Sequence, residues 1–191
     1  MASNENVQSA ANPSGAEAVR SFVWRMLRAA KLDASLYDEV ESDRAAMGQA
    51  VSVIILSSIA AGIGGGAFNA PGILMMTITA FAGWFLWAFL TFFIGTRFLP
   101  QENTHADYLR LLRTIGFASS PGLIRIFGVF PAVRSFIFFA ASAWMVIAMV
   151  IAVRESLSYT STMRAAAVVA IGWAIQFILI VFVMGIILRL T

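Results

Sequence analysis

The sequence of 191 residues contains no cysteine, and it has one histidine, His105. Disulfides, thiolate metal sites and a cysteine nucleophile are therefore excluded. Charged residues make up only 12% of the chain, whereas soluble domains contain about 25%. Few side chains are left that could perform acid–base chemistry or bind a metal.

Acidic residues are missing from the long apolar segments, and His105 lies outside them. Their absence argues against proton-coupled transport, intramembrane proteolysis by aspartate or zinc, and histidine-ligated haem. The sequence also lacks a nucleophile elbow, a Walker loop and a dinucleotide fingerprint, and the glycines at 62–66 favour close helix packing instead. We predict a protein that is not an enzyme and holds no cofactor and no metal.

Hydrophobic residues are abundant, at 60% of the chain, and they are gathered into long runs. A bilayer core about 30 Å thick requires roughly 20 apolar residues in a helix. Four runs meet this requirement, at about 47–68, 73–99, 135–153 and 163–188. We therefore predict an all-α fold, an integral membrane helical bundle.

A further apolar segment, 110–130, is short and broken by proline and glycine. It contains Pro121 and Arg125, and a guanidinium at the bilayer centre costs roughly 2.5–3.5 kcal/mol on insertion scales. Arg125 either extends to the membrane surface or belongs to an intramembrane polar site with Pro121. The segment is either the third of five transmembrane helices or a re-entrant loop, which would return the C-terminus to the N-terminal side.

Basic residues are distributed asymmetrically in both topologies. Five spans place ten of the 13 Lys and Arg residues on the N-terminal side, and a re-entrant segment places eleven there. Both distributions predict a cytoplasmic N-terminus. For five spans the ten are Arg20, Arg25, Arg28, Lys31, Arg44, Arg97, Arg110, Arg113, Arg154 and Arg164.

The segment before the first span has two parts. Residues 1–16 are rich in small and polar residues, so we predict a disordered tail; residues 17–46 form a cytoplasmic amphipathic and acidic pre-membrane segment. A basic helix in this segment either lies on anionic lipid or docks on a partner or on the protein's own cytoplasmic face. Its candidate contact residues are Arg20, Trp24, Arg25, Arg28 and Lys31. The acidic residues at 33–44 are expected to be solvated rather than to bind a metal.

Small and polar residues within the spans mark candidate helix-packing positions. Ser57, Ser58, Ala61 and Gly62 allow a neighbouring helix to approach the first span closely, and we expect a tight hairpin of the first two spans. Gln176 in the last span is expected to form a hydrogen bond with a neighbouring helix.

Three stretches resemble bacterial members of the Ypt-interacting protein (Yip) domain family: KLDASLYDEVESDRAAMGQA, DYLRLLRTIGFASSPGLI and AVRESLSYTSTMRAAAVVAIGW. Gly116, Phe117 and Pro121 are similar to the family's glycine, aromatic, proline pattern at its third span. The resemblance implies five spans with a cytoplasmic N-terminus and an external C-terminus, so that residues 47–191 form a Yip-like transmembrane domain. The aspartate-leucine-tyrosine-glycine-proline motif of eukaryotic members is missing, so the resemblance does not carry their binding of Rab-type GTPases to this chain.

These observations predict a non-enzymatic scaffold, accessory subunit or organiser in the bacterial inner membrane. Its expected partners are membrane lipids and other integral membrane proteins or further copies of itself. Nucleic acid is not expected, because the basic residues are scattered rather than gathered on one face. The alternative is a small oligomeric channel, transporter or lipid-handling protein with a polar path near Arg125.

Overall fold

The computed structural model describes residues 15–66, 69–101 and 107–190. These residues form helices and no strand, which confirms the predicted all-α class. The predicted disordered tail lies outside the described residues, except for its last two positions, which begin the first helix. The elements are α2 (Gly15–Ala30), α3 (Ala34–Ser42), α4 (Ala46–Gly65), α5 (Ala70–Phe93), the π-helix η1 (Ile94–Phe98), α6 (Tyr108–Ala118), the 3-10 helix η2 (Ser120–Val129), α7 (Arg134–Ser156) and α8 (Thr162–Leu190).

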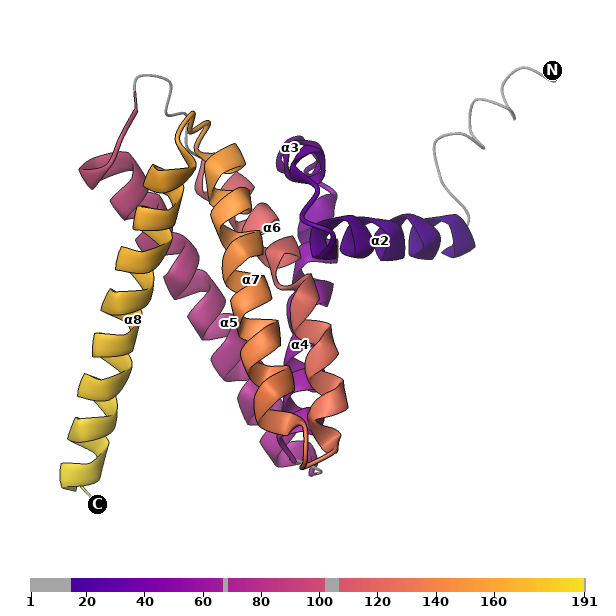
Figure 1. Ribbon diagram of the computed structural model, residues 1–191, viewed down its shortest axis with the longest axis vertical. Coiled ribbons are helices and arrows are strands. Elements are labelled where there is room, and N and C mark those ends of the chain that lie inside the picture. Colours follow the sequence, from indigo (N-terminus) through magenta and orange to yellow (C-terminus); the bar gives the residue numbers. More distant parts are fainter. Residues whose placement is uncertain (1–14, 67–68, 102–106, 191) are drawn as a thin grey trace.

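Four helices in the described part of the chain are long and apolar enough to cross a membrane, namely α4, α5 with η1, α7 and α8. The segment between α5 and α7 makes a fifth passage, because α6 and η2 together run along α4 and α7 from one end of the bundle to the other (Figure 1). The 3-10 geometry makes this possible: ten residues reach about 20 Å, against about 15 Å in an α-helix. As a result, α8 ends at the end of the bundle opposite α3 (Figure 1).

The closest packing in the bundle joins α4 to the α6–η2 segment. A Cβ added at Gly64 would overlap the backbone carbonyl oxygen of Arg125, and one added at Gly116 would lie 2.7 Å from the Cβ of Ala50. The close approach that we expected between the first two spans is therefore made with the third segment. The reason is that both α4 and the α6–η2 segment carry glycines at this contact, and the absence of side chains there lets the two backbones approach closely.

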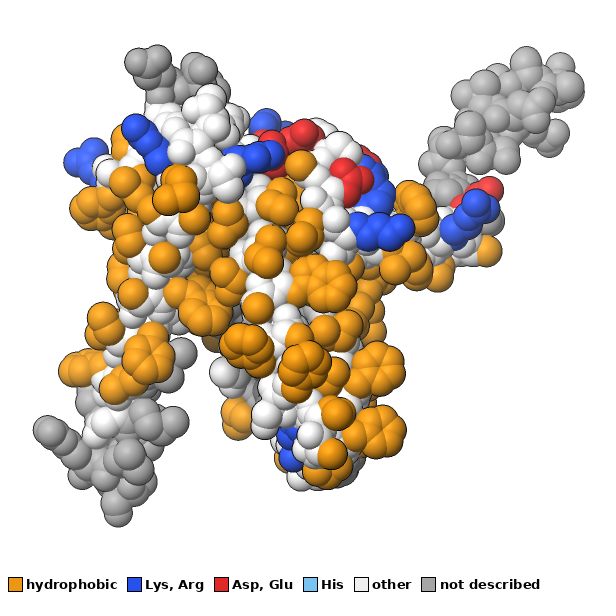
Figure 2. Space-filling view, viewed as in Figure 1, with side chains coloured by type: hydrophobic (Ala, Val, Ile, Leu, Met, Phe, Trp, Pro, Cys, Tyr) orange, Lys and Arg blue, Asp and Glu red, His pale blue; other side chains and the backbone are white. Residues whose placement is uncertain are grey.

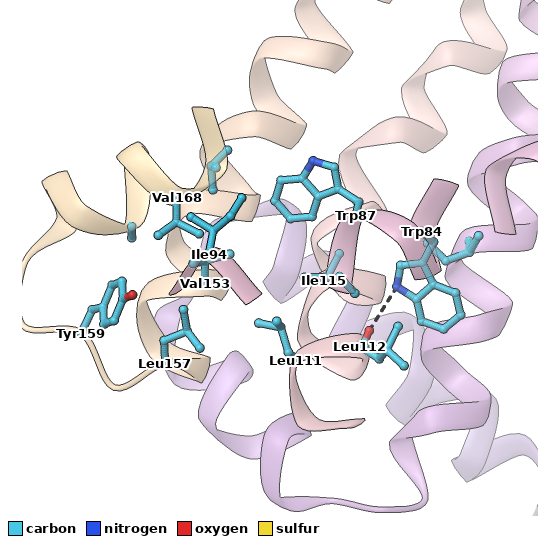
Figure 3. Packing of buried hydrophobic residues seen from close by; sticks show 14 residues of the cluster. Trp84, Trp87, Ile94, Leu111, Leu112, Ile115, Val153, Leu157, Tyr159 and Val168 are labelled. Atoms are coloured by element: carbon cyan, nitrogen blue, oxygen red, sulfur yellow. Dashed lines mark hydrogen bonds between the residues drawn. The ribbon is translucent and has the colours of Figure 1, made fainter. Parts of the chain in front are cut away.

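One hydrophobic core lies between α5, α6, α7 and the beginning of α8 (Figure 3). Trp84 donates from Nε1 to the carbonyl oxygen of Leu112 at 3.3 Å, and Tyr159 donates from its hydroxyl to Gly95 and Leu99 oxygens at 2.8 and 2.7 Å. The core includes the C-terminal half of α5 and the N-terminal part of α8. The other halves of these two helices diverge toward the far end of the bundle (Figure 1).

A second core attaches the pre-membrane helices to the bundle. Leu36, Tyr37 and Val40 of α3 are fully buried against α4, α6 and α7, together with Phe117. Trp144 of α7 donates from Nε1 to the carbonyl oxygen of Ala30 at 2.8 Å, which fixes the end of α2. Helix α3 is consequently part of the packed body of the bundle, although its sequence is polar and acidic.

Candidate functional site

A cavity of about 610 Å³ lies within the bundle, between α4, α5, η2, α7 and α8. Its volume is in the range of small-molecule sites, about 300–1,000 Å³. Its walls are mainly apolar, with Trp84, Trp173, Met145, Met149 and Phe177 among them. The cavity therefore suits a largely apolar occupant.

Five of the residues singled out in the sequence meet at this cavity. They are Ser57, Ser58, Ala61, Arg125 and Gln176. Gly62 and Pro121 are buried but stand outside its lining. The structure thus brings the small residues of the first span, the arginine of the third and the glutamine of the last to one place.

Arg125 is directed into the bundle rather than toward the membrane surface. Its Nη2 donates to the hydroxyl of Ser142 at 3.1 Å, about two turns inside α7, and its guanidinium lies 5.8 Å from the ring centroid of Phe138. Its Nε is buried without a hydrogen-bond partner. Among the described residues no carboxylate forms an ion pair with it. The cavity therefore has a positively charged side chain without a counter-ion in the described part of the chain.

The lining also includes other polar groups. The hydroxyls of Ser58 and Thr79 donate to backbone carbonyls of their own helices, at 2.7 and 2.9 Å. The indole Nε1 of Trp87 is buried and has no partner. Gln176 reaches α5, where its Nε2 would lie 3.6 Å from a Cβ added at Gly83. The lining thus includes two unpartnered N–H donors, those of Arg125 and Trp87.

The sequence indicated Arg125 and Gln176 because each is polar within an apolar segment. It did not indicate Trp87 as a donor, since tryptophan counts as apolar in any hydrophobic pattern. The available signal was the position of Trp87 well inside a span, away from the membrane surface where tryptophans usually lie.

The amphipathic helix α2 lies across the axis of the bundle, at the end where α3 packs (Figure 1). Two of its candidate contact residues form ion pairs with acidic residues at 33–43. Arg25 pairs with Glu39 at 2.8 Å and with Asp43 at 2.9 Å, and Arg28 pairs with Asp33 at 2.7 Å and with Glu39 at 2.5 Å. Asp33, Glu39 and Asp43 are therefore bound to arginine rather than simply solvated.

The remaining candidate contact residues of α2, Arg20, Trp24 and Lys31, are exposed, and Lys31 lies 5.9 Å from the ring centroid of Trp24. Apolar side chains of α2, including Val19 and Leu27, are exposed as well. Figure 2 shows hydrophobic side chains on the side of α2 that faces the far end of the bundle. The arginine side of α2 thus docks on the protein itself, and an apolar side of the helix is left exposed.

Arg113 is buried, with 5% of its surface exposed. The sequence did not single it out. Its Nε donates to the carbonyl oxygen of Val40 at 3.0 Å, and its Nη2 donates to that of Glu41. It therefore anchors the C-terminal end of α3 to α6. In the sequence Arg113 and Arg110 look alike, and only the packing of α3 distinguishes them.

We predict that acid releases α2 from α3 while the bundle stays folded. A hydrogen bond from Arg28 lowers the pKa of Asp33. Burial alone would raise the pKa of Glu39, but hydrogen bonds from Arg28 and Arg25 outweigh it, so this pKa is also lowered. A lowered carboxyl pKa contributes stability above the unfolded-state value, and this contribution is lost as the pH falls through the folded-state value. Docking should therefore weaken below about pH 4.

Spin labels test this prediction, since the chain has no native cysteine. A pair at Ser21→Cys and Met163→Cys should give a single distance at pH 7 and a broad distribution at low pH. A control pair at Leu109→Cys and Met163→Cys should keep its distance. Glu39→Gln should broaden the first distribution already at pH 7. An unchanged α2 distance throughout acidification would contradict the role of these ion pairs.

The family model for the Yip1 domain matches residues 36–184, which include most of α3 and most of the transmembrane part. The match begins within α3, in agreement with the packing of that helix into the bundle. No curated protein and no solved structure matches the chain.

Proposed function

We propose that this chain, which belongs to the Yip1 domain family of non-enzymatic multi-pass membrane proteins, is a scaffold or accessory subunit. Its partners are other integral membrane proteins or further copies of itself. The partners pack against the diverging halves of α5 and α8 and are organised around them.

One observation carries this proposal: among the side chains that the structure describes, the two helices share a core only at one end of the bundle. Beyond that core their large side chains are exposed, including Leu74 and Met75 on α5 and Phe177 and Phe182 on α8. Apolar exposure alone does not require a partner in lipid, because helices associate there through close packing and polar contacts. Gly83, Thr79 and Gln176 supply small and polar groups where the two helices begin to separate.

The orientation that we propose places α2 and α3 in the cytoplasm. Arg25, Arg28, Arg110 and Arg113 all contact α3 or the segment beside it, so they lie at this end of the bundle. A concentration of basic residues at one end is typical of the cytoplasmic side. The apolar side of α2 then contacts the inner surface of the bilayer. The resemblance to bacterial Yip-domain proteins supports the bacterial inner membrane as its location.

Photo-crosslinking in native membranes tests the scaffold role. A photoreactive residue replacing Ile178 on α8 should form adducts with a small, defined set of membrane proteins or with a second copy of the chain. Phe139 on α7 is a matched control, because it is 73% exposed on a helix that packs along its whole length. Adducts with lipid alone at Ile178, or the same protein adducts at both positions, would overturn the proposal.

A lipid-handling protein is the second candidate, and the placement of Arg125 in the cavity favours it over a channel or a transporter. The donors there face a mainly apolar, half-open cavity rather than a chain of polar groups. Such a cavity is suited to an amphiphile.

A further inference from the structure

We infer that the cavity binds an anionic phospholipid from the leaflet on the side opposite α3, with its phosphate at Arg125 and part of an acyl chain between α5 and α8. This inference goes beyond the scaffold role, and the site adjoins the scaffold surface, because Met75, Thr79 and Phe177 both line the cavity and lie on the diverging halves of α5 and α8. The inference depends on charge, on hydrogen bonding and on where the cavity lies.

Charge is the first argument. Arg125 is half-buried, its Nε is buried without a hydrogen-bond partner, and its contacts are a neutral hydroxyl and an aromatic ring. Withdrawing a cation from water without a counter-ion is costly. Among the described residues, none of those that line the cavity is acidic. An anion that enters the cavity can therefore form a charge-assisted hydrogen bond with Arg125. No carboxylate of the described residues competes for this contact.

Hydrogen bonding gives the second argument. The buried Nε of Arg125 and Nε1 of Trp87 both lack partners, and both residues line the cavity. The Nε of Arg125 is a donor only, so an oxygen acceptor at this end of the cavity satisfies it, whereas Trp87 lies farther inside the span. A phospholipid carries such acceptors in its phosphate and ester groups, whereas an apolar molecule carries none.

The position of Arg125 selects the leaflet. Its backbone is in contact with Gly64, next to the last residue of α4, and its ring contact, Phe138, is one turn from the start of α7. Both lie near the end of the bundle opposite α3. The rest of the lining extends from there into the middle of α5, α7 and α8, through Thr79, Met145 and Trp173. A phospholipid fits this position: its headgroup would lie near the membrane surface at Arg125, and its acyl chain would extend along the cavity toward the bilayer centre.

The experiment is native mass spectrometry of the full chain in mild detergent, titrated with phosphatidylglycerol, phosphatidylcholine or inorganic phosphate. We expect one tightly bound phosphatidylglycerol, with phosphatidylcholine roughly tenfold weaker and no binding of inorganic phosphate at the same concentration. Equal affinity for the two lipids would overturn the inference. Binding of inorganic phosphate as tight as that of the lipid would show an anion site without lipid specificity and would overturn it as well.

Variants locate the site. Arg125→Gln should remove the preference for phosphatidylglycerol, and Arg125→Lys should retain part of it. Arg134→Gln is the matched control: it is near the same end of the bundle, but its Nε donates to the carbonyl oxygen of Gly128. Thr79→Phe adds bulk to the cavity from an exposed position, so it should weaken lipid binding with Arg125 intact and the fold unchanged. If neither Arg125→Gln nor Thr79→Phe changes lipid binding, the lipid lies elsewhere.

Tryptophan fluorescence provides a second readout. Trp84, Trp87 and Trp173 line the cavity, whereas Trp24 and Trp144 do not. In a Trp24→Phe, Trp144→Phe background, phosphatidylglycerol with brominated acyl chains should quench more strongly than brominated phosphatidylcholine in vesicles of the same bromine content. The excess should disappear with Arg125→Gln. Equal quenching by both lipids in the unchanged cavity would contradict the assignment.

Discussion

Replacing Gly64 with alanine is expected to lower the free energy of unfolding by about 3 kcal/mol. The single added methyl group would overlap the backbone carbonyl oxygen of Arg125. A flexible side chain could turn away, but a carbonyl moves only with its helix. Either α4 separates from η2, or η2 shifts and takes Arg125 with it.

Gly65→Ala is the control for this change. A Cβ at Gly65 has as its nearest neighbour a ring carbon of Phe138 at 3.9 Å, which is an ordinary contact. Alanine is favoured over glycine in a helix by up to about 1 kcal/mol, so Gly65→Ala should leave stability unchanged or raise it slightly. Thermal unfolding in detergent, followed by circular dichroism, measures both variants. Equal effects at the two positions would contradict the close contact between α4 and η2.

Replacing Arg113 with methionine is expected to destabilise the protein by about 3 kcal/mol and to release α3. Methionine retains much of the apolar stem but leaves the carbonyl oxygens of Val40 and Glu41 without their donor. A buried polar group that loses its partner costs about 1–3 kcal/mol. Lysine should rescue only in part, since one ammonium does not reproduce the two-pronged guanidinium.

Arg110→Met serves as the comparison one helical turn away. The side chain of Arg110 is 52% exposed, and it pairs with Glu41 at 3.3 Å and with Asp107 at 3.7 Å. Ion pairs of this kind contribute at most about 1 kcal/mol. The two variants should therefore differ in melting temperature and in the rate at which protease cleaves the 30–46 segment. Similar losses for both would show that Arg113 acts through its charge and not through its bonds to α3.

The sequence was sufficient for the transmembrane plan because the bilayer imposes a simple rule on length and apolarity. The spans around Ile54, Thr79 and Ala148 follow from that rule alone. It did not determine the course of the third segment, where the apolar composition favoured a crossing and Pro121 and Arg125 counted against it. The resemblance to the Yip family favoured a crossing, and η2 shows how the crossing is made: the 3-10 helix compensates for the lack of residues.

Individual residues of the candidate site could be predicted from the sequence, but their meeting in one cavity could not. Ser57, Arg125 and Gln176 each stand out because they are small or polar in an apolar surrounding. That they share one cavity depends on the tilt of α5 and α8, which no local pattern encodes. The docking of α3 was also beyond the sequence, because its acidic residues look solvated until Arg25 and Arg28 of α2 are placed beside them.

The extended geometry of η2 also bears on how the protein is made. During biosynthesis, segments enter the bilayer largely according to their own hydrophobicity, and a short segment that carries an arginine is a weak candidate for entry. The contacts of Gly116, Gly122 and Gly128 with α4 and α7 are available only after at least one of those helices is in place. We therefore expect the third crossing to form by folding within the membrane. The topology of everything after it, including α7 and α8, is inherited from that step.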